Sequence, residues 1–228
     1  MIAPAAYGVQ AQESSSSSAP APQAQAAPAT GQQSVQARIR ARREQRRAQA
    51  IHDTYGHLYE VFVGGGYLRT KPGPDLQKVT MYSWDVAVTR FFNEKLGVTA
   101  DGRGYYGTAY VRNNETALTR PAVSTYSFMA GPTYRFYVRP RYSLSARGMG
   151  GVAIGNFSGD TNGFTPASLG LYSDATTYAL SGGVVGDVNV SPNLSLRLSG
   201  DYFGTGFGSQ TQNGVGFTYG FVYRFGKL

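Results

Sequence analysis

The sequence contains no cysteine, one tryptophan and two histidines in 228 residues. Without cysteine the chain cannot form a disulfide scaffold, a thiolate nucleophile or a Cys-ligated metal site. The two histidines, His52 and His57, are close together in the chain. A histidine-rich metal cluster or a distributed Ser-His-Asp set is therefore hard to build. No apolar run reaches the roughly 18 residues that identify a transmembrane helix.

Glycine and aromatic residues are abundant, whereas leucine, glutamate and lysine are scarce. The chain has 30 Gly, 17 Tyr and 12 Phe, and only 15% of its residues are charged. These values differ from ordinary globular usage, in which leucine, glutamate and lysine are among the commonest residues. The composition favours a protein of many short strands over a helical one.

The net charge of +8 is unevenly distributed along the chain. Residues 1–50 hold six arginines and two glutamates, which gives +4. Residues 51–228 hold the other 15 basic and 11 acidic residues, which also gives +4. Half of the excess charge therefore lies in less than a quarter of the chain, as in a basic segment joined to a nearly balanced domain.

Residues 1–34 consist mainly of alanine, proline, glutamine and serine. Such a segment buries too little apolar area to offset the entropy of ordering, so we expect it to be disordered. Val9-Gln10-Ala11 fits the small-x-Ala pattern that precedes a signal-peptidase cut, which makes residues 1–11 a candidate signal-peptide remnant. A plain disordered tail is the alternative interpretation.

From residue 57 to residue 228 the hydrophobic pattern alternates with a period of two, which is typical of strands. A tilted strand needs about 10 residues to cross a bilayer, and the alternating segments are at least this long. We predict eight strands, at residues 57–69, 78–92, 95–109, 121–137, 141–156, 176–190, 194–205 and 214–226.

The connections between these strands alternate in length. Tight turns fall at residues 93–94, 138–140 and 191–193, and longer polar loops join the other strands, the longest at about 156–175. Short turns on one side and long loops on the other are typical of outer-membrane barrels. The fold class is therefore predicted as all-β: an eight-stranded antiparallel up-and-down transmembrane β-barrel, with both ends on the periplasmic short-turn side.

The two faces of the predicted strands differ in chemistry. One face is rich in aromatic and branched side chains, as in Phe217, Tyr219 and Phe221. The opposite face collects ten charges, which we expect to pair inside the lumen as a structural network: Glu60, Asp85, Asp101, Arg103, Arg135, Arg147, Asp187, Arg197, Asp201 and Arg224. An arginine on the lipid face would instead cost about 2–4 kcal/mol at mid-bilayer. A soluble sandwich with a charged outer face is the alternative.

The last strand resembles the C-terminal assembly signal of outer-membrane proteins, with a polar residue, a glycine and two aromatics at Thr218, Gly220, Tyr223 and Phe225. Three further segments are similar to strands of small Gram-negative barrels of the OmpA-like and opacity-protein superfamily: 84–101, 126–132 and 183–189. The resemblance covers residues 57–228. It implies an outer-membrane location and contact with the barrel assembly machinery, and it implies no single activity.

Residues 35–56 form an Arg-rich segment between the tail and the barrel. Good helix formers and the absence of glycine and proline predict a helix over 35–51. Its basic residues are Arg38, Arg40, Arg42, Arg43, Arg46 and Arg47. A solvated tether is one interpretation. Contact with a cell-wall polymer, with anionic lipid or with the barrel mouth is another, and no nucleic-acid module accompanies the charge.

An enzymatic role is not expected. Barrel-borne hydrolases of the outer membrane rely on a histidine in the barrel, and none follows His57. The loop acids lie in different loops without a motif, at Asp75, Glu115, Asp160 and Asp174. We expect no catalytic residue, no cofactor and no metal.

The expected role is therefore in envelope structure or surface interaction, with a narrow passive channel for small or apolar solutes as the alternative. An eight-stranded lumen is just wide enough for side chains to fill it. Long loops often carry function, and we expect Phe164, Leu169, Leu171 and Tyr172 to be exposed in the longest one. The expected partners are outer-membrane lipid and the assembly machinery, and the expected state is a monomer.

Overall fold

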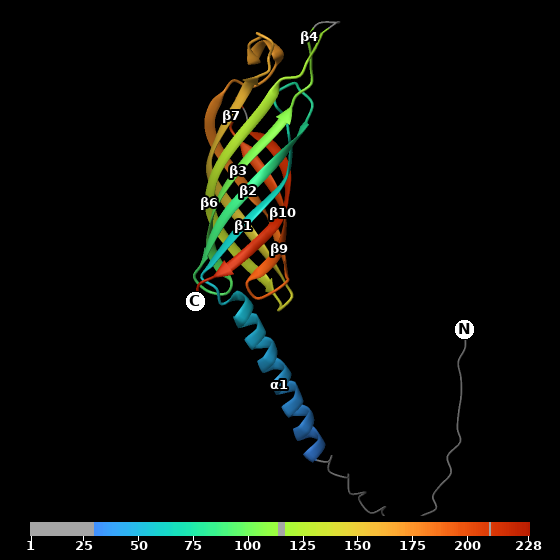
Figure 1. The fold of residues 1–228 in the computed structure, drawn as a ribbon, viewed down its shortest axis with the longest axis vertical. Coiled ribbons are helices and arrows are strands. Elements are labelled where there is room, and N and C mark those ends of the chain that lie inside the picture. The colour runs from blue at the N-terminus through green and yellow to red at the C-terminus, as the bar shows by residue number, and fades with distance from the viewer. Residues whose placement is uncertain (1–29, 114–116, 210) are drawn as a thin grey trace, which may run out of the picture. The chain divides into compact units, whose positions relative to one another are not determined.

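A computed structural model describes residues 30–113, 117–209 and 211–228 of the chain (Figure 1). Eight long strands form a closed barrel in the order β1-β10-β9-β8-β7-β6-β3-β2, and every neighbouring pair is antiparallel. The predicted fold class is confirmed. The strands are β1 (Tyr59–Thr70), β2 (Val79–Phe91), β3 (Leu96–Thr108), β6 (Ala122–Val138), β7 (Tyr142–Gly159), β8 (Ala175–Asn189), β9 (Leu194–Thr205) and β10 (Gln212–Phe225).

The connections define two ends of the barrel. At the "turn end", short turns join β2 to β3, β6 to β7 and β8 to β9, and the first and last strands meet where Tyr59 pairs with Phe225. At the "loop end", longer segments join the other strands. Figure 1 shows β1 beside β10, the pair that closes the barrel.

The long loops contain structure that strand periodicity did not predict. A small hairpin, β4 (Val111–Asn113) and β5 (Ala117–Thr119), lies between β3 and β6. The loop between β7 and β8 contains a 3-10 helix, η1 (Pro166–Leu169), which Thr165 caps by accepting a hydrogen bond from the Ser168 N–H. Segments of three or four residues are too short for a periodic pattern to reveal them.

The N-terminal helix α1 spans Thr30–Tyr55. Residues 30–34 were expected in the disordered segment, and this boundary was wrong. The last proline before the helix is Pro28, and residues 32–55 contain neither proline nor glycine, the two residues that disfavour a helix interior. The expectations for disorder over residues 1–29 and for a signal-peptide remnant at 1–11 lie outside the described residues. None of the described helices has the length and apolar character of a membrane span.

The outer wall of the barrel is apolar and carries an aromatic belt near each end. At the turn end, Tyr59 stacks on Phe225 with ring centroids 5.6 Å apart. At the loop end, Tyr67 lies 6.0 Å from Phe217 on the same two strands. Tyr59 and Tyr67 are eight residues apart on β1, about 26 Å along the strand at 3.3 Å per residue. The exposed side chains between the belts include Val63, Val86, Val88, Phe128, Val152, Leu180, Val184 and Leu198.

Candidate functional site: the interior of the barrel

All ten charged residues predicted for the lumen lie inside the barrel and are buried. Strand alternation places them there, because each lies on the face opposite the exposed apolar residues. The structure separates them into two clusters at different heights. Among the described residues, no ion pair joins one cluster to the other.

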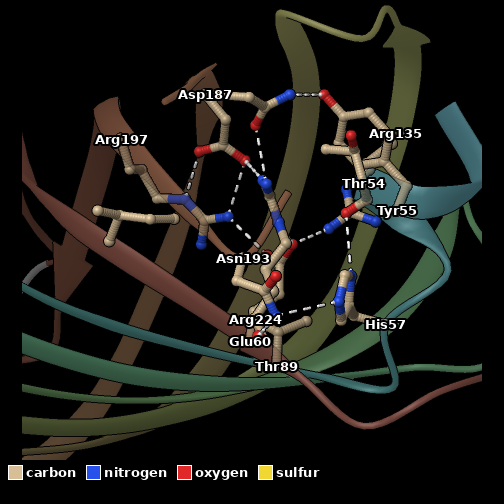
Figure 2. Close-up of polar contacts among 12 residues, drawn as sticks. Thr54, Tyr55, His57, Glu60, Thr89, Arg135, Asp187, Asn193, Arg197 and Arg224 are labelled. Atoms are coloured by element: carbon tan, nitrogen blue, oxygen red, sulfur yellow. Dashed lines mark hydrogen bonds and ion pairs between the residues drawn. The ribbon is translucent and has the colours of Figure 1, made fainter. Parts of the chain in front are cut away.

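The "turn-end cluster" consists of Glu60, Asp187, Arg135, Arg197 and Arg224 (Figure 2). Glu60 is its centre: it pairs with Arg135, with Arg197 at 2.8 Å and with Arg224 at 2.6 Å. Asp187 accepts two hydrogen bonds from Arg197, at 2.7 and 2.9 Å. Two carboxylates therefore face three guanidinium groups, and the cluster carries a formal excess of one positive charge.

The "mid-barrel cluster" consists of Asp85, Asp101, Asp201, Arg103 and Arg147. Arg103 binds Asp101 through two nitrogens at 2.7 and 2.9 Å. Arg147 binds Asp201 in the same forked manner at 3.0 and 2.5 Å. Asp85 lies 3.4 Å from Arg103 Nε, and neither of its oxygens accepts a hydrogen bond in the described part of the chain. Three carboxylates face two guanidinium groups, so the excess is one negative charge.

A small apolar group lies next to both clusters, on the adjacent strands β10, β1 and β2. It is formed by Phe62, Ala87 and Val222, which contact one another inside the barrel. On β1, Phe62 is the next inward-facing residue after Glu60. On β2, Ala87 is the inward-facing residue next to Asp85, and both Ala87 and Val222 pair with Phe62 in the register. The formal charges of the two clusters, +1 and −1, are opposite, so the ten buried charges sum to zero.

At the turn end, the side chain of Tyr55, the last residue of α1, is buried against the turn-end cluster, and we call it the "Tyr55 stopper". Its side chain is 0% exposed. The hydroxyl donates to the Arg139 carbonyl oxygen at 3.0 Å and accepts from the Asn189 side-chain amide at 2.6 Å. The guanidinium carbons of Arg135 and Arg224 lie 5.0 and 5.1 Å from the ring centroid (Figure 2). Such distances are typical of cation–π contacts.

Sequence reasoning did not single out Tyr55. Contact between the Arg-rich segment and the barrel mouth was one of the predicted alternatives, but it was predicted from the charge of the arginines and not from Tyr55. The available signal was an aromatic residue at the end of a polar helix, directly before the first strand. The chain after it is also tied to the barrel, because the Leu228 N–H donates to the Gly56 carbonyl oxygen at 3.0 Å.

At the loop end, apolar side chains of the longest loop are buried, contrary to expectation. Leu169, Leu171 and Tyr172 were predicted to be exposed, yet all three are buried, and only Phe164 of that group is exposed. They contact a set of lumen-facing and loop residues that we call, together with them, the "loop-end plug": Leu68, Met81, Tyr105, Val123, Met149, Ala153, Phe157, Ala179, Phe203 and Phe207. The lumen at this end is apolar, so the loop buries apolar surface by folding over it.

Phe157 is the centre of the loop-end plug. Its ring makes edge-to-face contacts with Phe207 at 5.3 Å and with Tyr172 at 5.8 Å. Asp174 fixes the base of the loop by accepting hydrogen bonds from the Phe157 N–H at 2.6 Å and from the Ser158 hydroxyl at 2.7 Å. Burial raises the pKa of the Tyr172 hydroxyl, and the Asp75 carboxylate adds to this effect. The cavity that remains among these residues is about 20 Å³, room for about one water molecule.

Comparison with known proteins supports this architecture. No family model matches the sequence, and no curated protein sequence matches it significantly. Neisserial surface protein A has a similar structure, with a TM-score of 0.50, 17% identity, and coverage of 73% of this chain and 97% of that one. The chain has the fold of the small outer-membrane β-barrels. Ail, the attachment invasion locus protein of Yersinia pestis, is 20% identical over 73% of this chain and 97% of its own, with a TM-score of 0.48.

The other predicted site residues lie on the barrel wall and on the helix. In β10, Thr218 points into the barrel, where its hydroxyl lies 2.5 Å from that of Ser199. Tyr223 and Phe225 of the same strand point outward and are exposed. The six arginines of the basic segment are all exposed on α1. No group of three or more histidine or acidic side chains in the described ranges is arranged to hold a metal ion.

Proposed function

We propose that the chain is an outer-membrane protein of a Gram-negative-type cell, with a closed lumen and a role in envelope structure or surface interaction. The observation that carries the proposal is the pairing of an apolar, belted outer wall with a charged interior. A soluble barrel would expose the charges and bury the aromatic residues, since a buried charge is costly unless it is paired. Transmembrane barrels have a lipid-facing apolar band about 25 Å tall between aromatic girdles.

The packing of the lumen supports a structural role over a channel. A solute that entered from the turn end would meet the Tyr55 stopper and then two layers of paired charges. From the other end it would meet the loop-end plug. Eight-stranded barrels hold little more than their own side chains. We propose no catalytic role, because the buried carboxylates are all engaged by or adjacent to arginines and lie beyond the reach of a substrate.

The orientation follows from the same features. In transmembrane barrels of this class the short turns face the periplasm and the longer loops face outward. We propose that α1 and both barrel termini are periplasmic, and that the loop around exposed Phe164 faces the exterior. The β10 residues Thr218, Gly220, Tyr223 and Phe225 would then be available to the assembly machinery before the barrel closes.

The test combines insertion with conductance. Refolded protein is added to phospholipid vesicles and floated on a density gradient, then run on an SDS gel with and without boiling. We expect co-flotation, a mobility shift on boiling, and no steady conductance in a planar bilayer. Protein that stays soluble without vesicles and shows no shift would contradict the membrane proposal. A stable open conductance of the wild type would instead favour the narrow-channel alternative.

The exposed arginines of α1 favour a second contact, with an anionic polymer of the cell wall. Six guanidinium groups lie within ten residues of one helix, and only Glu44 opposes them in that stretch. Co-sedimentation with purified cell-wall sacculi, compared between the wild type and a variant with all six arginines changed to glutamine, tests this contact. Anionic vesicles serve as the competing ligand, and equal binding of both proteins to sacculi would reject it.

A further inference from the structure

A groove of about 880 Å³ lies on the outer wall of the barrel at the loop end. Most of its strand residues have the outward parity of the wall, whereas Val123 belongs to the loop-end plug behind it. The ends of β2, β3, β6 and β7 contribute to it. Its lining comprises Lys78, Val79, Thr80, Tyr82, Tyr106, Gly107, Thr108, Tyr110, Ala122, Val123, Ser124, Asn156 and Gly159.

The lining combines aromatic rings, hydroxyl groups and positive charge. Tyr82 is the most exposed large apolar side chain in the described barrel, at 74%, and Tyr110 is 65% exposed. Among the described residues of the lining, Lys78 is the only charged one. The Arg120 guanidinium lies 5.6 Å from the centre of the ring of Tyr110, which also lines the groove. The described residues therefore supply Lys78 in the lining, Arg120 next to it through Tyr110, and no carboxylate.

Below the groove the wall is apolar and its aromatic side chains are held in place. Tyr106 donates a hydrogen bond to Tyr126 at 2.9 Å and accepts one from the Trp84 indole at 3.4 Å. The indole packs against Gly104, where an added Cβ would come within 2.4 Å of the indole nitrogen. Glycine is needed at that position for the indole to pack against the strand. Further toward the barrel centre the exposed wall continues with Val86 and Phe128.

We propose that this groove binds an anionic membrane lipid, with its phosphate-bearing headgroup at Lys78 and Arg120 and an acyl chain along Trp84, Val86 and Phe128. The inference rests on the proposed membrane location. Tyrosine and tryptophan are favoured at headgroup depth because one end of each ring system is apolar and the other polar. Two cations above a fixed aromatic wall match an anionic headgroup above its chains by charge complementarity.

Trp84 provides a direct probe, because it is the only tryptophan in the chain. Bromine atoms on lipid chains quench tryptophan fluorescence on contact. The refolded barrel is inserted into vesicles that contain brominated phosphatidylglycerol or brominated phosphatidylcholine at equal mole fraction, and the relative association at Trp84 is calculated from the quenching. A basic residue near a membrane surface is worth about 1 kcal/mol, so we expect a preference of about fivefold or more for the anionic lipid.

The key variant is the double substitution Lys78→Glu and Arg120→Glu, which should bring the preference to about one. The matched control is the double substitution Lys95→Glu and Arg141→Glu, the same total charge change on two exposed residues at the turn end, and it should leave the preference unchanged. A boiling shift on an SDS gel confirms that each variant has folded. Raising the salt concentration should weaken the preference in the wild type and have little effect in the double variant.

The outcomes separate this inference from the membrane proposal. Equal quenching of wild-type Trp84 by both lipids would overturn the lipid site and leave the membrane location standing. The same conclusion would follow if the double variant kept the full preference. Absence of quenching by either lipid, in protein that shows the boiling shift, would overturn the membrane location itself.

Discussion

The two halves of the lumen are filled in different ways. Toward the turn end, ten buried charges form two ion-pair clusters, whereas toward the loop end the filling is apolar and includes side chains from a loop. A charged filling is stable only if each ion has partners, and those partners are set by strand register. An apolar filling tolerates changes in partner but needs enough side-chain volume, which the loop between β7 and β8 supplies here. One barrel therefore depends on precise pairing at one end and on close packing at the other.

Changing Glu60 to glutamine should have the largest effect on this comparison. The substitution leaves Arg135, Arg197 and Arg224 with one fewer carboxylate in a buried site. Removal of one partner of a buried ion pair typically costs about 3–5 kcal/mol. The free energy of unfolding in urea, measured in vesicles, reports the loss. Glu94→Gln, at a half-buried turn residue that contacts His52, is the control and should stay within about 0.5 kcal/mol of the wild type.

Changing Arg147 to leucine tests the mid-barrel cluster. Asp201 loses its forked partner, and Asp101 loses a neighbour at 3.7 Å. We expect a destabilisation of about 3 kcal/mol, since two buried carboxylates become less well compensated, and a rise in bilayer conductance as the layer loosens. Unchanged unfolding together with unchanged conductance would show that the cluster does not hold the lumen closed.

Changing Leu169 to alanine tests the apolar half. This side chain is buried in the loop-end plug, and Leu→Ala substitutions in packed interiors cost about 2–5 kcal/mol. We expect a value near the lower limit, because the loop can move to reduce the cavity, and faster proteolysis within residues 160–174. Phe164→Ala in the same loop is the matched control, because Phe164 is exposed. Equal protease sensitivity of the two variants would argue against a packed plug.

Changing Tyr55 to phenylalanine should have the smallest effect. The ring and its contacts with Arg135 and Arg224 remain, while the hydrogen bonds to Arg139 and Asn189 are lost. The loss of a buried hydrogen bond costs about 1–2 kcal/mol at most sites. Tyr55→Ala removes the ring as well, so it should raise conductance where the phenylalanine variant does not. If neither variant raises the bilayer conductance, the Tyr55 ring is not required to close the turn end.

The turn-end half of the comparison was accessible from the sequence, and the loop-end half was not. Period-two alternation identified all eight strands to within a few residues, because the outward-facing residues of each strand are mostly apolar and alternate with inward-facing residues that are small, polar or charged over much of the strand. The same parity placed Glu60 and Arg224 on one face without stating which charges would pair. The pairing depends on the shear of the closed barrel, which no single strand encodes.

The burial of Leu169 and Tyr172 could not be predicted in the same way. A loop has no periodic pattern, and its apolar residues bear no mark that separates an exposed contact from a folded plug. Tyr55 was missed for a related reason: it lies at the boundary between a helix and a strand, where neither period applies. Both features depend on surfaces that exist only after the barrel has closed.

The pair formed by Glu60 and Arg224 joins the first strand to the last, where the two residues lie opposite each other in the register. Sliding β10 by two residues would preserve the alternation of inward and outward side chains, so the apolar wall alone cannot distinguish the two alignments. The slipped alignments would place Val222 or Gly226 opposite Glu60 and leave a carboxylate without its neighbour. The ion pair therefore acts as an alignment mark, which only the correctly closed barrel can satisfy.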